Sequence, residues 1–470
     1  MVQTYGVANE HDEPGTAGAH ISGESDALLG ADASAKKLKA EGHATIHSCV
    51  GNLANTIVGS GMLTFPLALA ASGIIPGMIT CLFSGGVAAF GLYLLSLCAV
   101  KAPHRRASFF AIAELTFPRA AVFFDAAIAI KCFGVSISYL IIIKALMPNV
   151  VAALYHDLAS EDTIPPAWAL SGRVWITIMM LILVPLSFLR KLDSLRHTSY
   201  IALFSVAYLV VIVVSCYFFP IKGTQARGEV HLIKFSSNFV STFPVQVFAY
   251  TCAQNLFPIF NEINRNTQKR MNIVIGTSIG GAAVIYEIIA VFGYLTFGSK
   301  VGANIIAMYP STSLFIAVGQ LAIAILVMFS YPLQVHPCRN CLDKVFHAGH
   351  VLPKSGSLGD IEMEDEHGGS PDMSPLKHTL LTVAIITSGF TIAYFVDDLQ
   401  MVLSFVGSTG STTISFILPG LFYWKLTRND PEGKQLNRAA LALAIYGVLV
   451  CIFCLSYNIY SLVYQTGTVH

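Results

Sequence analysis

Charged residues are scarce in this sequence of 470 residues. Asp, Glu, Lys and Arg make up 12% of the chain, whereas they make up about 25% of soluble globular domains. Apolar residues make up 54%, above the roughly 45–50% of soluble domains. This composition excludes an ordinary water-soluble domain and places most of the chain in lipid.

Cysteine pairs are also missing from the loops. Most of the ten cysteines fall in apolar segments, so they indicate small core residues and no disulfide framework. Cys338 and Cys341 have the spacing of half a zinc site, but no second pair accompanies them, and we expect no metal. The sequence shows no cluster of His, Asp or Cys residues at one depth of the membrane, so we do not expect an enzyme.

The first 45 residues are polar and rich in Gly, Ala, Ser and acids. Such a stretch cannot bury enough apolar surface to fold alone, and it predicts a disordered cytosolic tail. It lacks the charged start, short apolar core and cleavage site of a secretory signal. Glu24, Leu28 and Leu29 resemble an acidic dileucine signal, which sorting adaptors bind, although so short a pattern also arises by chance.

Long apolar runs then fill the rest of the chain. A bilayer core of about 30 Å requires roughly 20 apolar residues per helix. We count eleven candidate spans, with soft boundaries, and they lie near residues 47–71, 74–100, 121–151, 173–190, 198–220, 238–260, 272–298, 311–335, 377–396, 399–424 and 438–463.

The basic residues give an independent test of this count, since cytosolic loops hold most of the Lys and Arg in membrane proteins. With the N-terminus inside, 21 of the 28 basic residues fall in inner segments. We therefore expect a cytosolic N-terminus and a lumenal C-terminus. The one long loop, residues 343–376, carries Gly, Ser, Pro and an acidic run, and is expected to be flexible and cytosolic.

The odd number of spans suggests five plus five plus one, in which two halves form an inverted repeat and each half opens with a broken helix. Residues 46–465 would form this transporter domain, with a first repeat at about 47–220, a second at about 238–424 and an extra helix at about 438–463. The first span contains Gly59-Ser60-Gly61, and the sixth contains the polar run Thr251 to Asn255. The sequence therefore predicts an all-α polytopic membrane protein with breaks in spans 1 and 6.

Unwound backbone in a membrane must be buried in protein or line a polar cavity. Free N–H groups at the start of a half-helix suit a carboxylate, whereas freed carbonyls suit an ammonium group or a cation. A zwitterionic amino acid matches both. The alternative for the glycines is close helix packing, which explains the polar run of span 6 less well.

Several stretches resemble the amino acid/auxin permease family, which includes the sodium-coupled neutral amino-acid transporters of animals and the vacuolar amino-acid transporters of fungi. The resemblance covers about residues 45–425, and SYPLQVHPCR looks most like the fungal vacuolar branch. The matching stretches are GNLANTIVGSGMLTFPLALAASGI, FGVSISYLIII, FAYTCAQNLFPIFNEI, FGYLTFG, SYPLQVHPCR and FVGSTGSTTISFILPG.

The resemblance implies an eleven-helix transporter with the LeuT-like fold, coupled to a cation gradient. It places the substrate carboxylate on the backbone of Gly59, Ser60 and Gly61. Asn55 and Ser330 match a cation site of the sodium-coupled members. Some relatives have threonine in place of the serine, so the resemblance does not decide whether the coupling cation is a proton or sodium. Vacuolar members are generally proton-driven.

Other candidates come from polar residues within the spans. Tyr250, Thr251 and Gln254 flank the break of span 6, and Ser408 and Thr409 of span 10 are expected to face the interior. These five positions form the predicted substrate site together with Gly59, Ser60 and Gly61.

Charges inside a bilayer are costly and often functional. Glu287, near the centre of span 7, suits proton loading, yet a structural carboxyl is about as good an explanation. Lys131 lies a third of the way into span 3. Lys144 stands where many relatives have an acid, and the sequence leaves open whether it reaches the interface or favours an acidic substrate.

We therefore expect a proton-coupled transporter that moves amino acids from the lumen of a vacuole to the cytosol by alternating access. Its expected partners are an amino acid, membrane lipid and a sorting adaptor at the tail, with no nucleic acid and no cofactor besides the coupling ion, proton or sodium. The alternatives are an amino-acid sensor that signals through its cytosolic tail, and sodium-coupled uptake at the plasma membrane.

Overall fold

Apolar segments form helices here because a backbone in lipid must satisfy its own N–H and C=O groups. The computed structural model describes residues 42–102, 105, 107–158, 165–189, 198–347, 373–430 and 433–466. Within these ranges the fold is all-helical and contains no β-strand, apart from an isolated bridge between Ala44 and Ile263.

Most of the described chain forms long helices. Eight of its helical segments are long and apolar enough to cross a membrane, and a bent pair makes a ninth candidate. The uninterrupted helices, with the short α5, are α4 (Ile74–Lys101), α5 (Phe109–Thr116), α6 (Ala121–Leu158), α7 (Gly172–Ser187), α8 (Thr198–Phe218), α11 (Gln268–Phe297), α12 (Leu314–His347), α13 (Pro375–Phe395) and α16 (Lys434–Thr466).

Three apolar segments are interrupted. The first bends by 48° between α2 (Ile46–Ile57) and the pair η1 (Ser60–Thr64) and α3 (Phe65–Ser72). The second consists of α9 (Phe239–Ala249), η4 (Ala253–Asn255) and α10 (Leu256–Glu262). The third has two π-helical turns, η7 (Gly407–Ser411) and η8 (Thr413–Ile417), between α14 (Leu399–Val406) and α15 (Leu418–Leu426).

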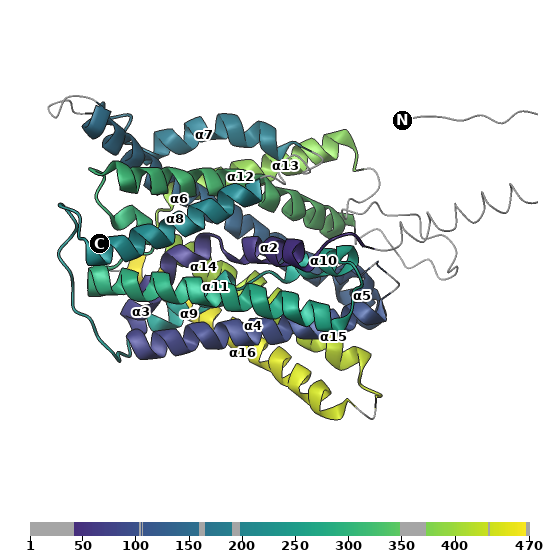
Figure 1. Cartoon of the computed structure of the whole chain (residues 1–470). Coiled ribbons are helices and arrows are strands. Elements are labelled where there is room, and N and C mark those ends of the chain that lie inside the picture. The colour runs from purple at the N-terminus through teal and green to yellow at the C-terminus, as the bar shows by residue number, and fades with distance from the viewer. Residues whose placement is uncertain are drawn as a thin grey trace, which may run out of the picture.

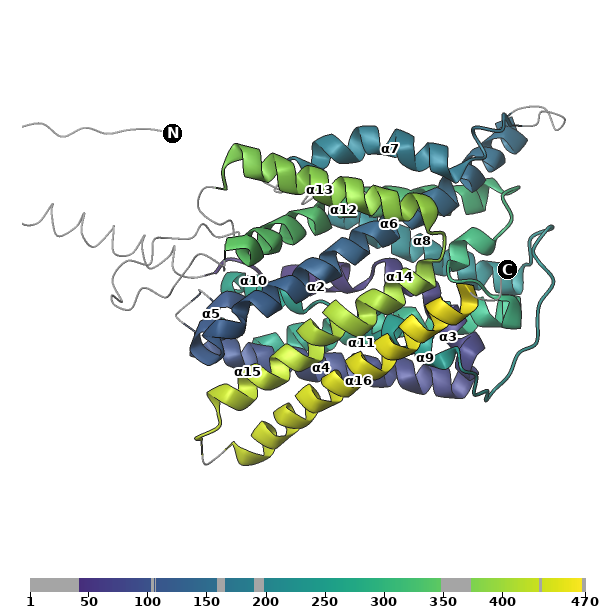
Figure 2. The same ribbon diagram turned by 180° about the vertical axis from the view of Figure 1, so that it is seen from behind.

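The helices lie side by side along one direction (Figure 1). The half-helices α2 and α10 lie toward the end that holds α5, whereas α3 and α9 lie toward the opposite end. Helix α6 crosses the middle of the bundle, and α16 lies on its rim (Figure 2). The most apolar stretch of α6 is 83% buried, against 28% for α16, so α6 is the scaffold on which the interrupted segments pack.

Capping residues fix where several helices begin. The Thr45 hydroxyl accepts a hydrogen bond from the Ser48 amide at 3.2 Å and starts α2. The Asp398 carboxylate accepts one from the Met401 amide at 3.0 Å and starts α14. Each cap satisfies an amide that has no partner within its helix.

Helix α12 continues past Asp343, where the sequence suggests the start of a loop, and ends at His347. The reason is that Asp343 is buried and forms an ion pair with Lys377 of α13, which holds the last turns of α12 against that helix. The rest of this stretch up to residue 372 lies outside the described residues, as do Glu24, Leu28 and Leu29.

Candidate functional site

The first break, at Val58–Gly61, frees backbone amides inside the bundle. Gly59 is extended, with φ −135° and ψ −146°, and a new turn begins when the Met62 amide donates to the Gly59 carbonyl at 3.2 Å. The amides of Ser60 and Gly61 open this turn and therefore have no acceptor within it. Both residues are buried. The predicted carboxylate-binding backbone thus lies at the start of a half-helix, inside the protein.

The second break, at Tyr250–Asn255, ends α9 in a similar way. Thr251 closes the last turn: its amide donates to Phe248 O and its hydroxyl donates to Val247 O, both at 2.9 Å. Tyr250 is 1% exposed, and its hydroxyl lies 3.3 Å from the Cys81 thiol of α4. The Gln254 side-chain oxygen is buried without a hydrogen-bond partner among the described residues. It is therefore an acceptor without a donor beside the break.

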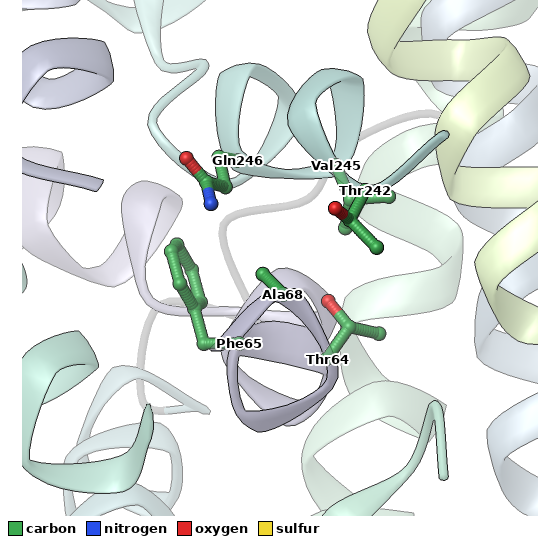
Figure 3. A pocket seen from close by; sticks show the side chains of 6 residues that line it. All are labelled: Thr64, Phe65, Ala68, Thr242, Val245 and Gln246. Carbon is green, nitrogen blue, oxygen red and sulfur yellow. The ribbon is translucent and has the colours of Figure 1, made fainter. Parts of the chain in front are cut away.

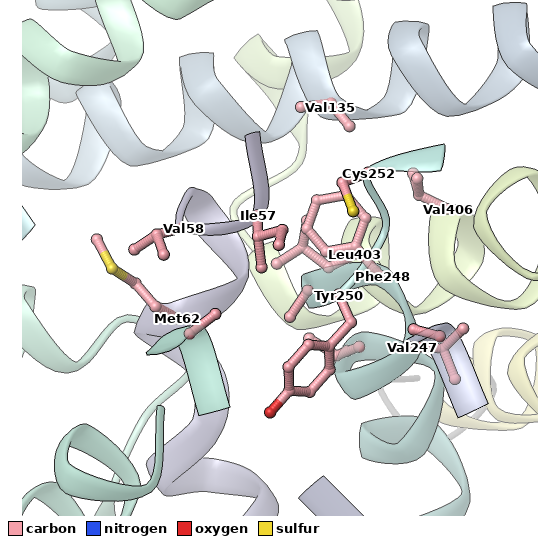
Figure 4. Packing of buried hydrophobic residues seen from close by; sticks show 14 of the residues in the cluster. Ile57, Val58, Met62, Val135, Val247, Phe248, Tyr250, Cys252, Leu403 and Val406 are labelled. Carbon is pink, nitrogen blue, oxygen red and sulfur yellow. The ribbon is translucent and has the colours of Figure 1, made fainter. Parts of the chain in front are cut away.

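The two breaks contact each other directly. A Cβ added to Gly61 would lie 2.6 Å from the Ala249 Cβ and 2.9 Å from the Ala249 Cα, so only glycine permits this approach. Ile57, Val58 and Met62 of the first broken segment and Phe248 and Tyr250 of the second belong to one buried cluster (Figure 4).

Tyr286 of α11 joins the two breaks, and it is not among the site residues predicted from the sequence. Its hydroxyl donates to the Ile57 carbonyl at 2.7 Å and to the Ala249 carbonyl at 2.9 Å, the last residues of α2 and α9. The ring stacks on Phe65 at 4.5 Å and meets Tyr250 edge-on at 5.1 Å. A buried tyrosine at this position could not be distinguished by sequence from an ordinary core aromatic.

Hydroxyls from neighbouring helices reach both breaks. Ser138 of α6 donates to the Ser60 hydroxyl at 3.4 Å, and Ser415 of η8 donates to the Thr251 hydroxyl at 3.3 Å. The two hydroxyls selected from span 10 are bonded elsewhere. Ser408 donates to Ser404 O at 2.8 Å and Thr409 to Phe405 O at 2.6 Å, both one turn back in their own segment.

The three candidates for cation coupling are spread over three helices. Asn55 lies in α2 and Ser330 in α12, and neither side chain makes a hydrogen bond within the described part of the chain. Glu287 of α11 has both carboxyl oxygens buried with no hydrogen-bond partner in that same part. Cys81 lies close enough to interact with this carboxyl, and its thiol also contacts the Tyr250 hydroxyl. Glu287 is therefore connected through one residue to the second break.

Lys144 has a structural environment. Its ammonium group donates to the carbonyls of Ala393, Tyr394 and Val396 at 2.8, 3.1 and 3.1 Å. It also forms an ion pair with Asp397 at 2.6 Å. Lys144 thus caps the carboxyl end of α13, where cations are stabilised by the helix dipole.

A pocket separates the half-helices α3 and α9 (Figure 3). Its lining is Thr64, Phe65, Ala68, Thr242, Val245 and Gln246. Gln246 is 1% exposed, and neither atom of its amide group has a hydrogen-bond partner among the described residues. The pocket has no room for a water molecule, so the amide stays unsatisfied. An unsatisfied buried amide group costs about 1–3 kcal/mol.

The half-helices at the other end are joined by polar bonds. The Ala44 amide donates to Glu262 O at 3.0 Å, and the Asn264 amide donates to Ala44 O at 2.9 Å. The Asn255 side chain donates to the Thr56 hydroxyl. The α2–α10 end is therefore closed by hydrogen bonds. The end of α3 is bound in a similar way by the segment before α9, where the Lys234 amide donates to Ser72 O at 2.9 Å and the Ser236 hydroxyl donates to Ala71 O at 2.8 Å.

Comparison with known proteins places this architecture in a family. The family model described as transmembrane amino acid transporter protein matches residues 42–463. The chain belongs to this family of transmembrane amino acid transporters. The family is one of transporters and not of enzymes.

Individual members of the family share much of the sequence. The chain is 42% identical to vacuolar amino acid transporter 5 of Schizosaccharomyces pombe, over 90% of this chain and 96% of that protein. It is 35% identical to vacuolar amino acid transporter 6 of Saccharomyces cerevisiae, over 88% of this chain and 98% of that protein. The similarity therefore extends over nearly the whole length of both relatives.

Proposed function

We propose that this protein moves amino acids across the vacuolar membrane, from lumen to cytosol, coupled to protons and by alternating access. The observation that carries the proposal is the meeting of two broken helices, at Gly61 and Ala249, inside a bundle of this family. The names of the fungal relatives supply the substrate class and the membrane.

Eleven spans are consistent with the described helices. The nine candidates become eleven when the 16-residue α7 and the interrupted pair α9 and α10 are added. In this count the first broken segment opens one group of five spans, the second opens another, and α16 is the extra helix. Two broken helices at corresponding positions are what an inverted repeat of the LeuT-like type produces.

The breaks offer complementary groups for a zwitterion. Amides at Gly59, Ser60 and Gly61 suit the substrate carboxylate, since a half-helix begins there. Carbonyls at the end of α9, near Tyr250 and Thr251, suit its ammonium group. The Gln254 oxygen adds a further acceptor.

Both ends are closed by contacts that alternating access would break in turn. Separation of α3 from α9 would hydrate the Gln246 amide and remove its desolvation cost. It would also strain the bonds of Lys234 and Ser236 to the end of α3. Separation of α2 from α10 would break the backbone bonds of Ala44. The structure is closed at both ends around the breaks, and we expect the unsatisfied Gln246 amide to favour opening on the α3–α9 side.

Coupling is assigned to Asn55, Ser330 and Glu287. Protons are the proposed driving ion because the Glu287 carboxyl is buried without a hydrogen bond in the described chain, as expected of a group that exchanges a proton. Glu24, Leu28 and Leu29 are the proposed sorting signal for an adaptor at a cytosolic N-terminal tail, with the C-terminus in the lumen.

Uptake into liposomes tests the proposal. Purified full-length protein is reconstituted, and labelled amino acids are added with a pH gradient, a sodium gradient or neither. We expect accumulation driven by the pH gradient and abolished by a protonophore. A vesicle without protein measures the leak.

The other results separate the alternatives. Saturable binding without accumulation under any gradient would favour an amino-acid sensor and contradict transport. Accumulation that requires a sodium gradient and does not depend on the pH gradient would contradict proton coupling but not amino-acid transport.

A further inference from the structure

Lys131 of α6 is a buried cation without a counter-ion among the residues that the structure describes. It is 4% exposed, and its ammonium group makes one hydrogen bond, to the Gln334 side-chain oxygen of α12 at 3.4 Å. Among the residues that the structure describes, no carboxylate forms an ion pair with it. Within the described ranges, two of its three N–H donors therefore have no acceptor.

The contrast with Lys144 on the same helix shows that this is unusual. Lys144 is 8% exposed, and its ammonium group contacts three carbonyls and Asp397. That is how a structural lysine in this bundle is stabilised. Lys131 lacks such an environment, and a buried charge without a partner destabilises the fold, so packing gives no reason for a lysine there.

The position of Lys131 connects it to both breaks. Lys131, Val135 and Ser138 follow one face of α6 at helical spacing, and Ser138 contacts Ser60 at the first break. Seven residues of helix place Lys131 about 10 Å from Ser138 along α6. Val135, one turn from Lys131, belongs to the same buried cluster as Cys252 of the second break (Figure 4).

The other side of this lysine meets the π-helical turn of span 10. A Cβ on Gly410 would lie 2.7 Å from the Lys131 Cβ, so η7 packs directly on this turn of α6. Cys252 also lies close enough to Lys131 to interact with it electrostatically. Lys131 is thus enclosed by α12, η7 and the second break. It lies on the same face of α6 as the proposed carboxylate site, about two turns nearer the start of that helix.

We propose that Lys131 and Gln334 bind the side-chain carboxylate of an acidic amino acid. This inference rests on the proposed transport function and names its substrate class. The first break holds the substrate's main-chain carboxylate, and the ammonium group of Lys131 pairs with the second carboxylate. The Gln334 side-chain oxygen accepts from Lys131, which leaves the NH2 group of the same amide, without an acceptor in the described chain, to donate to the other carboxylate oxygen.

Uptake of glutamate and of glutamine tests this pairing. The two amino acids have the same shape, but glutamate ends in a carboxylate and glutamine in an uncharged carboxamide. The proteins are the full-length chain and its Lys131→Met and Lys131→Arg variants in liposomes. Methionine keeps most of the length and removes the charge, and the fold should tolerate it because that charge has no counter-ion among the described residues.

We expect the wild-type protein to prefer glutamate. Lys131→Met should raise the KM for glutamate on the order of 100-fold, as for the loss of a buried ion pair, and change the KM for glutamine by less than about threefold. Lys131→Arg should retain the preference for glutamate.

Two results would overturn the inference and leave transport intact: an unchanged ratio of glutamate to glutamine uptake in Lys131→Met, or a wild-type protein that takes up glutamine but not glutamate. If Lys131→Met does not fold, competition of unlabelled glutamate and glutamine against a tracer in the wild-type protein gives the same decision. A wild-type protein that accumulates no amino acid would remove the proposed function itself, and this inference with it.

Discussion

Replacement of Tyr286 by phenylalanine tests whether one hydroxyl holds the two breaks together. The hydroxyl is within 2.9 Å of both the Ile57 and the Ala249 carbonyl, and the residue is fully buried. Phenylalanine keeps the ring that packs on Phe65 and Tyr250. The substitution therefore removes the hydrogen bonds and little else.

The expected cost follows from what the hydroxyl can do. It has one proton, so at any moment it makes one strong hydrogen bond and one weaker interaction. Its removal leaves a buried carbonyl without a donor, which costs about 1–3 kcal/mol. We expect the free energy of unfolding to fall by that amount, rather than by twice that amount.

Transport should change as well, because the ends of α2 and α9 lose their common anchor. We expect Tyr286→Phe to raise the KM for the transported amino acid, since the backbone groups at the breaks are then less well positioned. The measurements are SDS-induced unfolding of the purified protein in mixed micelles, and uptake in liposomes.

Tyr294→Phe is the matched control. Tyr294 is equally buried on α11, two turns further on, and its hydroxyl accepts from the His231 amide at 2.9 Å, away from both breaks. It should lose about 0.5–1.5 kcal/mol of stability and keep its KM. If Tyr286→Phe matched the wild-type protein in both stability and KM, the reasoning about the breaks would be refuted.

Three further predictions concern the breaks and the coupling residues. Gly61→Ala should cost about 1–3 kcal/mol of stability because its Cβ meets the backbone of α9; Gly51→Ala, with nothing within 4 Å of its Cβ, should be neutral or stabilising by up to about 1 kcal/mol. Glu287→Gln should abolish accumulation driven by a pH gradient yet leave substrate exchange, and normal accumulation would remove Glu287 from the coupling path. Asn55→Ala and Ser330→Ala should weaken the pH dependence of uptake, and an unchanged pH profile in both would contradict their assignment.

The interruptions of the helices could be predicted from sequence for a local reason. Gly59-Ser60-Gly61 lacks the side chains that stabilise a helix, and the side chains of the polar run Thr251 to Asn255 compete with helical hydrogen bonds. Both stretches are non-α-helical in the structure. The π-helical turns of span 10 gave no comparable signal, since their serines and threonines are also common in ordinary membrane helices.

Polar residues inside the helices were harder to assign. Sequence pointed to Ser408 and Thr409, yet Ser415 is the hydroxyl of that segment that reaches the second break. Residues seven apart share one face of an α-helix, but the π-helical turns between them shift that register. Lys144 likewise fits two roles by sequence, and only its contacts with the end of α13 distinguish them.

The sequence by itself determined the helical membrane class, the positions of the long apolar segments and the places where two of them break, because each depends on the composition of one short stretch. The tertiary structure alone decided which groups meet: the Tyr286 hydroxyl with two carbonyls, the Gln246 amide with nothing among the described residues, and Lys131 with Gln334. Such contacts depend on how helices far apart in the chain rotate and pack against one another, and no local pattern records that.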